Sequence, residues 1–169
     1  MKYIYQLKEI FRKRNKVVDF DVHTISRGVG INMQREFSPI PNVKDWLANI
    51  DILQCNENEL NTIVQNKTEI ESAAEIIRLG VKIVIITKGN KGAHLHYDSN
   101  GEIKSYFMNA VKINTVNKVG CGDIFGAVFF YSYISTGDVF KSLELANKAG
   151  ASAASIKDIT SQTILKPND

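Results

Sequence analysis

Apolar and polar positions along the chain follow two spacings, one typical of helices and one typical of strands. In residues 3–14 the apolar side chains recur at helical spacing, and residues 16–20 form a short run that predicts a buried strand. Residues 81–87 are β-branched and almost entirely apolar, as expected for a strand covered on both faces of a parallel sheet. Because helices and buried strands alternate, the pattern predicts an α/β fold with a mostly parallel sheet.

Turn and cap residues mark the remaining elements. Residues 21–42 are polar and contain glycine and proline, so we expect a long loop there, and loops of this length are often functional. Further along the chain the pattern predicts a short helix around Trp46, a strand at 50–53, helices near 57–65 and 69–79 with Gly80 after the second, a hairpin of 93–97 and 102–107, and helices at about 122–135 and 138–155. We expect these elements to form one α/β domain over residues 1–169.

Length, composition and charge are those of one ordinary soluble domain. Of the 169 residues, 44% are hydrophobic and 23% are charged. The net charge of +3 is small and its Lys and Arg residues are spread along the chain, which gives no indication of nucleic-acid binding. The sequence shows no CxxC pair, no signal-peptide core and no apolar run long enough to span a membrane. We therefore expect a cytoplasmic protein with no membrane partner.

The most informative stretch is a glycine-rich turn directly before an apolar helix. Gly120 and Gly122 bracket Cys121, and Asp123 follows in what should be the first helical turn. Glycine allows the backbone to direct several N–H groups at one point, and a helix N-terminus favours an anion such as phosphate. Two other interpretations exist: Asp123 simply caps the helix, or Gly126 completes a dinucleotide fingerprint. The fingerprint fails because its last glycine comes one place late.

Short polar or glycine-containing motifs recur at four places along the chain. They are Asn56-x-x-Glu59, Thr87-x-Gly89-x-x-Gly92, the run from Asn117 to Asp123, and the final-helix segment from Ala146 to Gly150. In this order, over about residues 16–156, the motifs resemble those of the ribokinase-like (PfkB) carbohydrate kinases. A single one of these motifs would be weak, but four in sequence form a specific signal.

The resemblance implies a three-layer, Rossmann-like (ribokinase-like) fold that transfers a phosphoryl group from ATP to a hydroxyl of a sugar or related small molecule. It implies that Asp123 takes the proton from the acceptor hydroxyl. The backbone N–H groups of Gly120, Cys121 and Gly122 would stabilise the charge on the transferring phosphate.

The resemblance also implies ligand-binding roles for residues outside that turn. Asn56 and Glu59 would help to place Mg²⁺ through water, although the same pair also fits a helix capping box. The residues implied at the nucleotide are Thr87, Lys88, Gly89, Gly92, Asn147 and Gly150. Lys88 departs from the family pattern and either adds charge near the phosphates or points to solvent. Asn147 and Gly150 fit close helix packing equally well.

Some positions depart from the family pattern or carry chemistry outside it. Asn117 and Lys118 replace the family's Asp and Thr, which puts in doubt any monovalent-cation site there. Cys121 replaces Ala and is either a reactive thiol at a helix N-terminus or simply a small residue. His94 and His96 project to the same side of a strand, but two metal ligands without a third are usually a polar strand face.

The family's N-terminal half, with its sugar-binding residues and β-lid, has no counterpart in this sequence. A piece of a longer protein, a shortened gene product and a minimal form all remain open. We expect a carbohydrate kinase or, alternatively, a non-catalytic nucleotide-binding or assembly module. Without that half, the strand around residues 17–20 would be uncovered, which favours a homo-oligomer. His23 follows this strand, in a region where the family places substrate-side residues.

Overall fold

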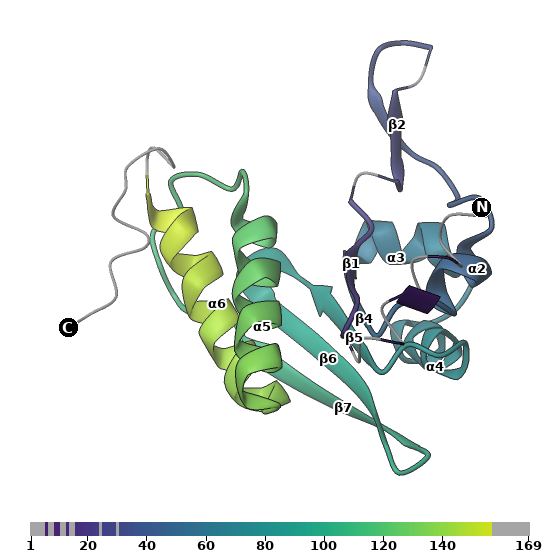
Figure 1. Ribbon diagram of the computed structural model, residues 1–169. Coiled ribbons are helices and arrows are strands. Elements are labelled where there is room, and N and C mark those ends of the chain that lie inside the picture. Colours follow the sequence, from purple (N-terminus) through teal and green to yellow (C-terminus); the bar gives the residue numbers. More distant parts are fainter. Residues whose placement is uncertain are drawn as a thin grey trace. The chain divides into compact units, whose positions relative to one another are not determined.

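The computed structural model describes residues 6, 9, 10, 13, 16–23, 25–29 and 31–156 (Figure 1). These residues belong to two compact units. Unit 1 comprises residues 1–88 and 94–107, and unit 2 comprises residues 89–93 and 108–169. The expected helix at residues 3–14 lies largely outside the described residues. That the whole chain is one domain stays a prediction.

A five-stranded sheet carries the fold, in the order β1-β4-β5-β6-β7. Its strands are β1 (Asp19–Asp21), β4 (Ile52–Asn56), β5 (Ile83–Thr87), β6 (Gly92–Ser99) and β7 (Glu102–Asn109). The strands β1, β4 and β5 are parallel, with Phe20 opposite Leu53 and Leu53 opposite Val84. Leu53 and Val84 are completely buried, which confirms the prediction of an α/β fold with a mostly parallel sheet.

The strands β6 and β7 form the predicted hairpin. Only Asn100 and Gly101 separate the two strands, and their φ angles of 57° and 85° are left-handed. Two successive left-handed residues favour a tight hairpin turn whose twist matches that of the strands. The connection from β5 to β6 is also too short for a parallel crossover, so β6 reverses the chain direction next to β5.

Three helices accompany the parallel strands of unit 1: α2 (Val43–Leu47), α3 (Glu57–Ile63) and α4 (Glu69–Arg78). Side-chain caps define the starts of the last two, because Asn56 and Glu59 form a capping box on α3 and Thr68 and Glu71 form one on α4. Gly80 follows α4 with a φ of 118°, in agreement with its predicted role at the helix end. The core between these elements is aliphatic and includes Leu47, Leu53, Ile76, Val84 and Ile86.

Residues 21–42 are not a plain loop, and that expectation was wrong. They contain a two-stranded antiparallel sheet of β2 (Arg27–Val29) and β3 (Arg35–Phe37), which is separate from the five-stranded sheet. Arg27 and Phe37 are opposite each other, and the Arg27 guanidinium lies 5.1 Å from the centre of the Phe37 ring. Such a cross-strand cation–π pair stabilises a short polar hairpin without the apolar alternation on which sequence prediction depends.

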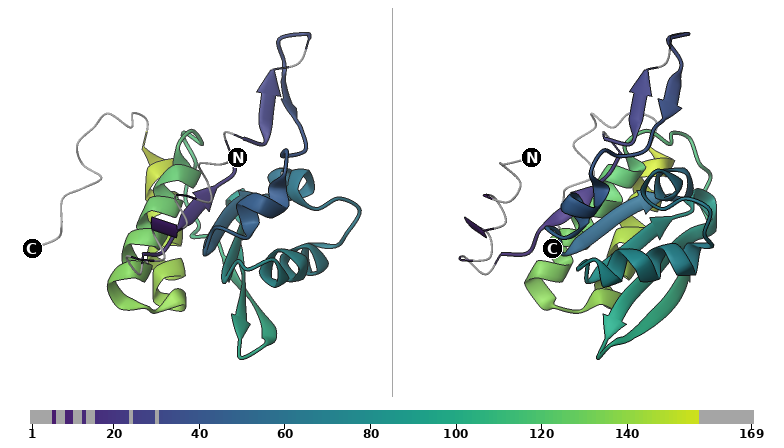
Figure 2. Two further views of the ribbon diagram at one scale, coloured as in Figure 1. Left: turned by 45° about the vertical axis from the view of Figure 1, so that its right-hand side comes forward. Right: turned by 90° about the vertical axis from the view of Figure 1, so that its right-hand side faces the viewer.

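Unit 2 consists mainly of two helices packed on each other, α5 (Cys121–Thr136) and α6 (Val139–Ser155), seen side by side in Figures 1 and 2. Gly137, with a φ of 70°, ends α5, and the Asp138 side chain then accepts hydrogen bonds from the N–H groups of Phe140 and Lys141. Both features confirm the cap predicted at Gly137-Asp138. In the described part of the chain, no helix is long and apolar enough to cross a membrane.

Candidate active site

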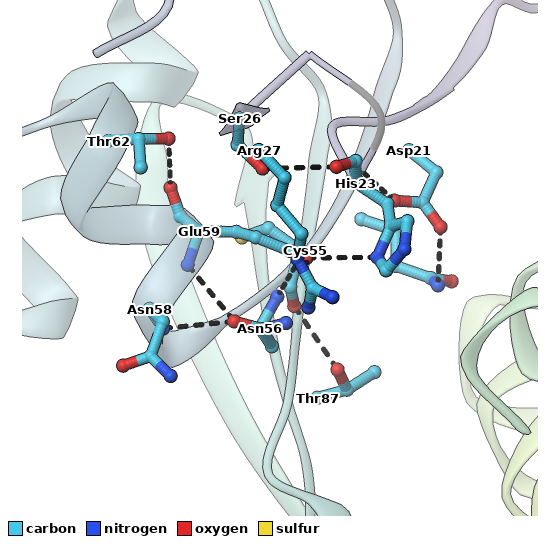
Figure 3. A network of polar contacts seen from close by, with 11 residues as sticks. Asp21, His23, Ser26, Arg27, Cys55, Asn56, Asn58, Glu59, Thr62 and Thr87 are labelled. Atoms are coloured by element: carbon cyan, nitrogen blue, oxygen red, sulfur yellow. Dashed lines mark hydrogen bonds and ion pairs between the residues drawn. The ribbon is translucent and has the colours of Figure 1, made fainter. Parts of the chain in front are cut away.

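The candidate residues of unit 1 lie at the carboxyl ends of three adjacent parallel strands. Asp21 ends β1, Asn56 ends β4 and Thr87 ends β5, and Asn56 and Thr87 are directly opposite in the sheet. The Thr87 hydroxyl donates a hydrogen bond to the Cys55 carbonyl at 3.3 Å, and Gln54 donates to Asp21 at 3.4 Å (Figure 3). Open parallel sheets bind ligands at this edge, so the fold brings these residues to the expected place.

Asn56 and Glu59 hold the start of α3. The Asn56 carbonyl oxygen Oδ1 accepts hydrogen bonds from the N–H groups of Asn58 and Glu59, both at 3.0 Å. In return, Glu59 Oε2 accepts from the Asn56 N–H at 2.9 Å. The capping-box interpretation of this motif is therefore correct for the structure.

The second oxygen of Glu59 is also occupied. Glu59 is only 3% exposed, and its Oε1 lies 3.2 Å from His23 Nδ1 and 3.2 Å from the Arg27 guanidinium (Figure 3). Arg27 comes from β2, within the segment for which the sequence predicted a loop. Since a buried carboxylate needs a partner of opposite charge or hydrogen-bonding partners, the Arg27 guanidinium, with His23 Nδ1 beside it, explains why Glu59 is tolerated inside the protein.

The oxygens of Asn56 and Glu59 are of the kind that Mg²⁺ prefers, and both already have protein partners. A water-mediated role leaves all of these hydrogen bonds intact, because Mg²⁺ keeps much of its hydration shell. The pair thus fits an outer-shell role, and its assignment to Mg²⁺ stays a prediction.

Lys88 follows β5 and is held by two carboxylates. Its Nζ lies 2.9 Å from Glu57 Oε1 and 2.6 Å from Glu69 Oε2, and its side chain is 17% exposed. Burial alone would lower the pKa of Lys88, but the hydrogen bonds to Glu69 and Glu57 raise it above its ordinary value. Lys88 is therefore charged, paired and turned away from bulk solvent.

The glycine-rich turn of unit 2 leads into α5 without a side-chain cap. Gly120 is left-handed, with a φ of 77°, and no side chain caps the N-terminus of α5. Gly122 has nothing within 4 Å of the position where a Cβ would lie, so the space beside it is open. Asp123 is exposed in the first turn of the helix. An open, uncapped helix start is suited to phosphate oxygens.

Cys121 is not an acidified thiol. Burial raises its pKa above the ordinary value, the nearby Asp123 charge adds to the increase, and a backbone hydrogen bond opposes it only in part. Its Sγ lies 3.4 Å from the Asn117 carbonyl, within hydrogen-bonding distance for sulfur. The raised pKa does not support the activated-thiol interpretation and favours the one in which Cys121 is a small residue.

The glycines assigned to the nucleotide differ in how strictly the packing requires glycine. A Cβ on Gly92 would lie 1.9 Å from the Met108 carbonyl oxygen, so no side chain fits there. A Cβ on Gly150 would lie 3.4 Å from the Cys121 carbonyl and 3.5 Å from Phe125, which is the close packing of α6 on α5. Gly89 has open space around it, and its left-handed φ of 56° favours glycine.

Asn147 lies on α6 and its side chain is used within unit 2. Its Nδ2 donates a hydrogen bond to the Asn109 carbonyl at the end of β7, with an N–O distance of 2.7 Å. This bond fixes the side chain of Asn147. Contact of Asn147 or Gly150 with an adenine stays a prediction.

Sequence reasoning missed three partners at these sites. Arg27 was not identified as a partner of Glu59 because its hairpin was not predicted. His23 was noted only as a residue that follows the first strand. Glu69, the first residue of α4, was not considered at all, although it contacts Lys88, His94 and His96. Only the tertiary fold brings Glu69, from 25 positions earlier in the chain, next to His94.

The chain matches the pfkB family of carbohydrate kinases over residues 25–163 and belongs to that family. Among characterised proteins, it is 33% identical to the ribokinase of Arabidopsis thaliana over 124 residues, or 70% of this chain and 31% of that one. It is 31% identical to the ATP-dependent ribose-1-phosphate kinase of Halopiger xanaduensis over 108 residues, or 64% of this chain and 34% of that one. The matched segment thus spans about a third of each relative.

Solved structures of ribokinases share the fold. Arabidopsis thaliana ribokinase, solved with ribose and ATP, superposes with a TM-score of 0.70 at 26% identity and covers 92% of this chain and 47% of that one. The ribokinase of Thermotoga maritima superposes with a TM-score of 0.70 at 19% identity, over 95% of this chain and 49% of that one. The fold is therefore the ribokinase fold, over about half the length of these solved structures.

Proposed function

We propose that this chain provides the nucleotide-binding and catalytic residues of an ATP-dependent sugar kinase. The observation that carries the proposal is the start of α5, where a left-handed Gly120, an open Gly122 and an uncapped helix N-terminus precede an exposed Asp123. Membership of the pfkB family supports the reaction class, and the Arabidopsis thaliana ribokinase structure contains ribose and ATP.

In this proposal Asp123 is the catalytic base. It accepts the proton of the acceptor hydroxyl as the oxygen attacks the γ-phosphorus, the bond from that phosphorus to the β,γ-bridging oxygen breaks, and ADP leaves. The backbone N–H groups of Gly120, Cys121 and Gly122 stabilise the charge on the transferring phosphoryl group, together with the positive end of the α5 dipole. Phosphoryl transfer depends mainly on positioning and charge stabilisation, so an ordinary carboxylate is a sufficient base.

The same proposal assigns a role to Mg²⁺ and a chemical class to the acceptor. Mg²⁺ neutralises phosphate charge when bound, and Asn56 and Glu59 would orient the water between the metal and the protein. The relatives named above are kinases of ribose and of ribose 1-phosphate. We therefore infer a sugar or sugar phosphate as acceptor.

Replacement of Asp123 tests the catalytic role. Asp123→Asn keeps the size of the side chain but removes the proton acceptor, so turnover should fall by about 10²–10⁴-fold while ATP affinity changes little. An ADP-release assay with Mg²⁺·ATP and a panel of pentoses, hexoses and their phosphates measures the first quantity, and calorimetry measures the second. Unchanged turnover would mean that Asp123 is not the catalytic base and has only a structural role in the first turn of α5. Nucleotide binding without turnover on any acceptor would instead support a non-catalytic nucleotide-binding module.

A second variant tests the anion site itself. Gly122→Val places a side chain in the open space beside the helix start, so it should weaken ATP binding by at least about 10-fold while the protein still folds. Ala127→Val is the matched control, because it places the same β-branched residue at an exposed position of the same helix. Equal ATP affinity in the two variants, measured by calorimetry, would contradict the proposed phosphate site.

A further inference from the structure

A cluster of three potential metal ligands lies within unit 1, away from the glycine-rich turn in the sequence. Glu69 is the first residue of α4, and His94 and His96 lie on β6. One ligand atom from each of the three residues lies within 4.8 Å of the others. The Glu69 Oε1 atom is central, at 2.5 Å from His94 Nδ1 and 3.6 Å from His96 Nε2.

His96 provides evidence for a ligand that is independent of the clustering of the three residues. Its side chain is completely buried, and Nε2 has no hydrogen-bond partner among the described residues. The distance of 3.6 Å from Nε2 to Glu69 Oε1 is too long for a hydrogen bond. A buried ring nitrogen without a hydrogen-bond partner is costly, and here it faces a carboxylate oxygen, an arrangement that a cation bound by both atoms would satisfy.

The other nitrogen of His96 is already held in the way that metal-binding histidines are held. Nδ1 lies 2.8 Å from the Ser105 hydroxyl of β7. With the proton on Nδ1 and donated to Ser105, the Nε2 lone pair points toward Glu69 and is available to a metal. Metal-binding histidines commonly donate their second N–H in this manner, which fixes both the tautomer and the ring orientation.

Ring packing also agrees with metal binding. The Phe107 ring packs edge-on against His94 at 5.4 Å and restricts its orientation.

We propose that Glu69, His94 and His96 form a three-ligand site for a divalent transition metal of the Zn²⁺ type. Two imidazole nitrogens and one carboxylate oxygen are a ligand set that suits Zn²⁺, with water in the fourth position. Tetrahedral coordination places ligand atoms about 3.3 Å apart, given Zn–N and Zn–O distances of about 2.0–2.1 Å. Metal entry therefore opens the 2.5 Å contact between Glu69 and His94 and leaves the 3.6 Å separation from His96 almost unchanged.

Lys88 is compatible with this site. It binds Glu69 through Oε2, at 2.6 Å, while the histidines face Oε1. Metal-bound carboxylates are usually hydrogen-bonded through their remaining oxygen, and Lys88 takes that position. The metal would join the start of α4 to β6 and so stabilise unit 1, independently of any nucleotide.

The test is metal binding by the full 169-residue chain, without nucleotide. A Cys121→Ser background removes the half-buried thiol as a competing ligand. After chelator treatment, Zn²⁺ affinity is measured by competition with a chromophoric chelator, and Co²⁺ is used as a spectroscopic probe. We expect one Zn²⁺ per chain, a Co²⁺ spectrum typical of tetrahedral nitrogen and oxygen ligands, and a Zn²⁺-dependent rise in the melting temperature.

Variants assign the binding to these residues. Glu69→Gln and His94→Gln should each weaken Zn²⁺ binding by more than about 10-fold and remove the thermal shift, since each deletes one of three ligands. Glu75→Gln, on the same helix and outside the cluster, should bind as the parent does. Circular dichroism confirms folding, and two ligand variants keep the test valid if one of them is unstable. No Zn²⁺ binding at micromolar concentrations, or equal binding by all four proteins, would overturn the proposal.

Discussion

At the residue scale, glycines that look alike in the sequence differ in how strictly the structure requires glycine at their positions. Gly92 is fixed by the fold, because a Cβ would collide with the Met108 carbonyl at 1.9 Å. Gly122 has open space around it and lies in the first turn of α5. The packing does not require glycine at position 122, and the open space beside it is compatible with the proposed phosphate site.

Asp19 gives a prediction for the pH dependence of stability. Burial and the nearby Asp21 raise its pKa to about 6, although a backbone hydrogen bond from Phe20 opposes the shift. Between about pH 4 and pH 6 the unfolded chain loses this proton while the folded protein keeps it. Asp19 therefore makes the folded protein less stable as pH rises through this window, and the penalty is constant above it.

The Asp19→Asn variant should remove this penalty. At pH 7.5 it should be more stable than the parent by about 1–3 kcal/mol, and the two should converge near pH 4. Urea denaturation from pH 4 to pH 8 measures the difference, with Glu102→Gln at an exposed hairpin position as the control. A gain in stability that is the same at pH 4 and pH 7.5 would show that Asp19 ionisation is not responsible.

At the scale of the elements, Glu59 connects the start of α3 to the hairpin of β2 and β3. Its capping bond to Asn56 is local, but its contacts with His23 and Arg27 join residues more than thirty positions apart. These contacts fix the hairpin base next to the carboxyl ends of β1 and β4. The elements around the candidate site are thus held by a buried charge network as well as by apolar packing.

A double-mutant cycle between Arg27 and Glu59 measures this connection. Arg27→Met leaves the Glu59 carboxylate buried with only partial compensation and should cost about 3 kcal/mol of folding free energy, whereas the double variant with Glu59→Gln should be much less destabilised. The expected coupling energy is about 1–3 kcal/mol, obtained from chemical denaturation of the four proteins. Additive effects would mean that the two side chains are not a functional ion pair in solution.

At the scale of the whole molecule, the matched segment covers about a third of each curated relative. In-line transfer needs an acceptor that is held in place and water that is kept out, and the residue roles proposed above include neither of these tasks. In the described sheet, β1 lies at one edge, and an edge strand can pair with a strand of another chain. Nucleotide binding should therefore exceed catalysis, and the edge favours self-association.

Both expectations can be measured on the 169-residue chain. Light scattering over a concentration series should show a dimer or larger assembly, and the ADP-release assay should show at most weak activity on common sugars. A monomer that phosphorylates one sugar at about 1–10³ per second would refute both statements. It would show that the acceptor site is complete within these residues.

Sequence alone determined the fold class, the family resemblance and most element positions. The β-branched run of residues 81–87 and the caps at Gly80 and Asp138 predicted their elements correctly, because periodicity and capping depend on neighbouring residues. Strand ends were less accurate: β1 begins at Asp19 and not at Lys16, and β4 extends to Asn56 and not only to Leu53. Pairing with an adjacent strand sets these limits, and pairing is not local.

Only the tertiary structure decided which distant residues become partners. It placed Arg27 on Glu59, paired Lys88 with two carboxylates, and brought Glu69 to the two histidines of β6, which the sequence had left as a pair without a third ligand. It also raised the pKa of Cys121, against the acidification that a helix N-terminus alone suggests. Burial, charge pairing and ligand sets depend on which segments the fold brings together, and spacing along the chain does not contain that information.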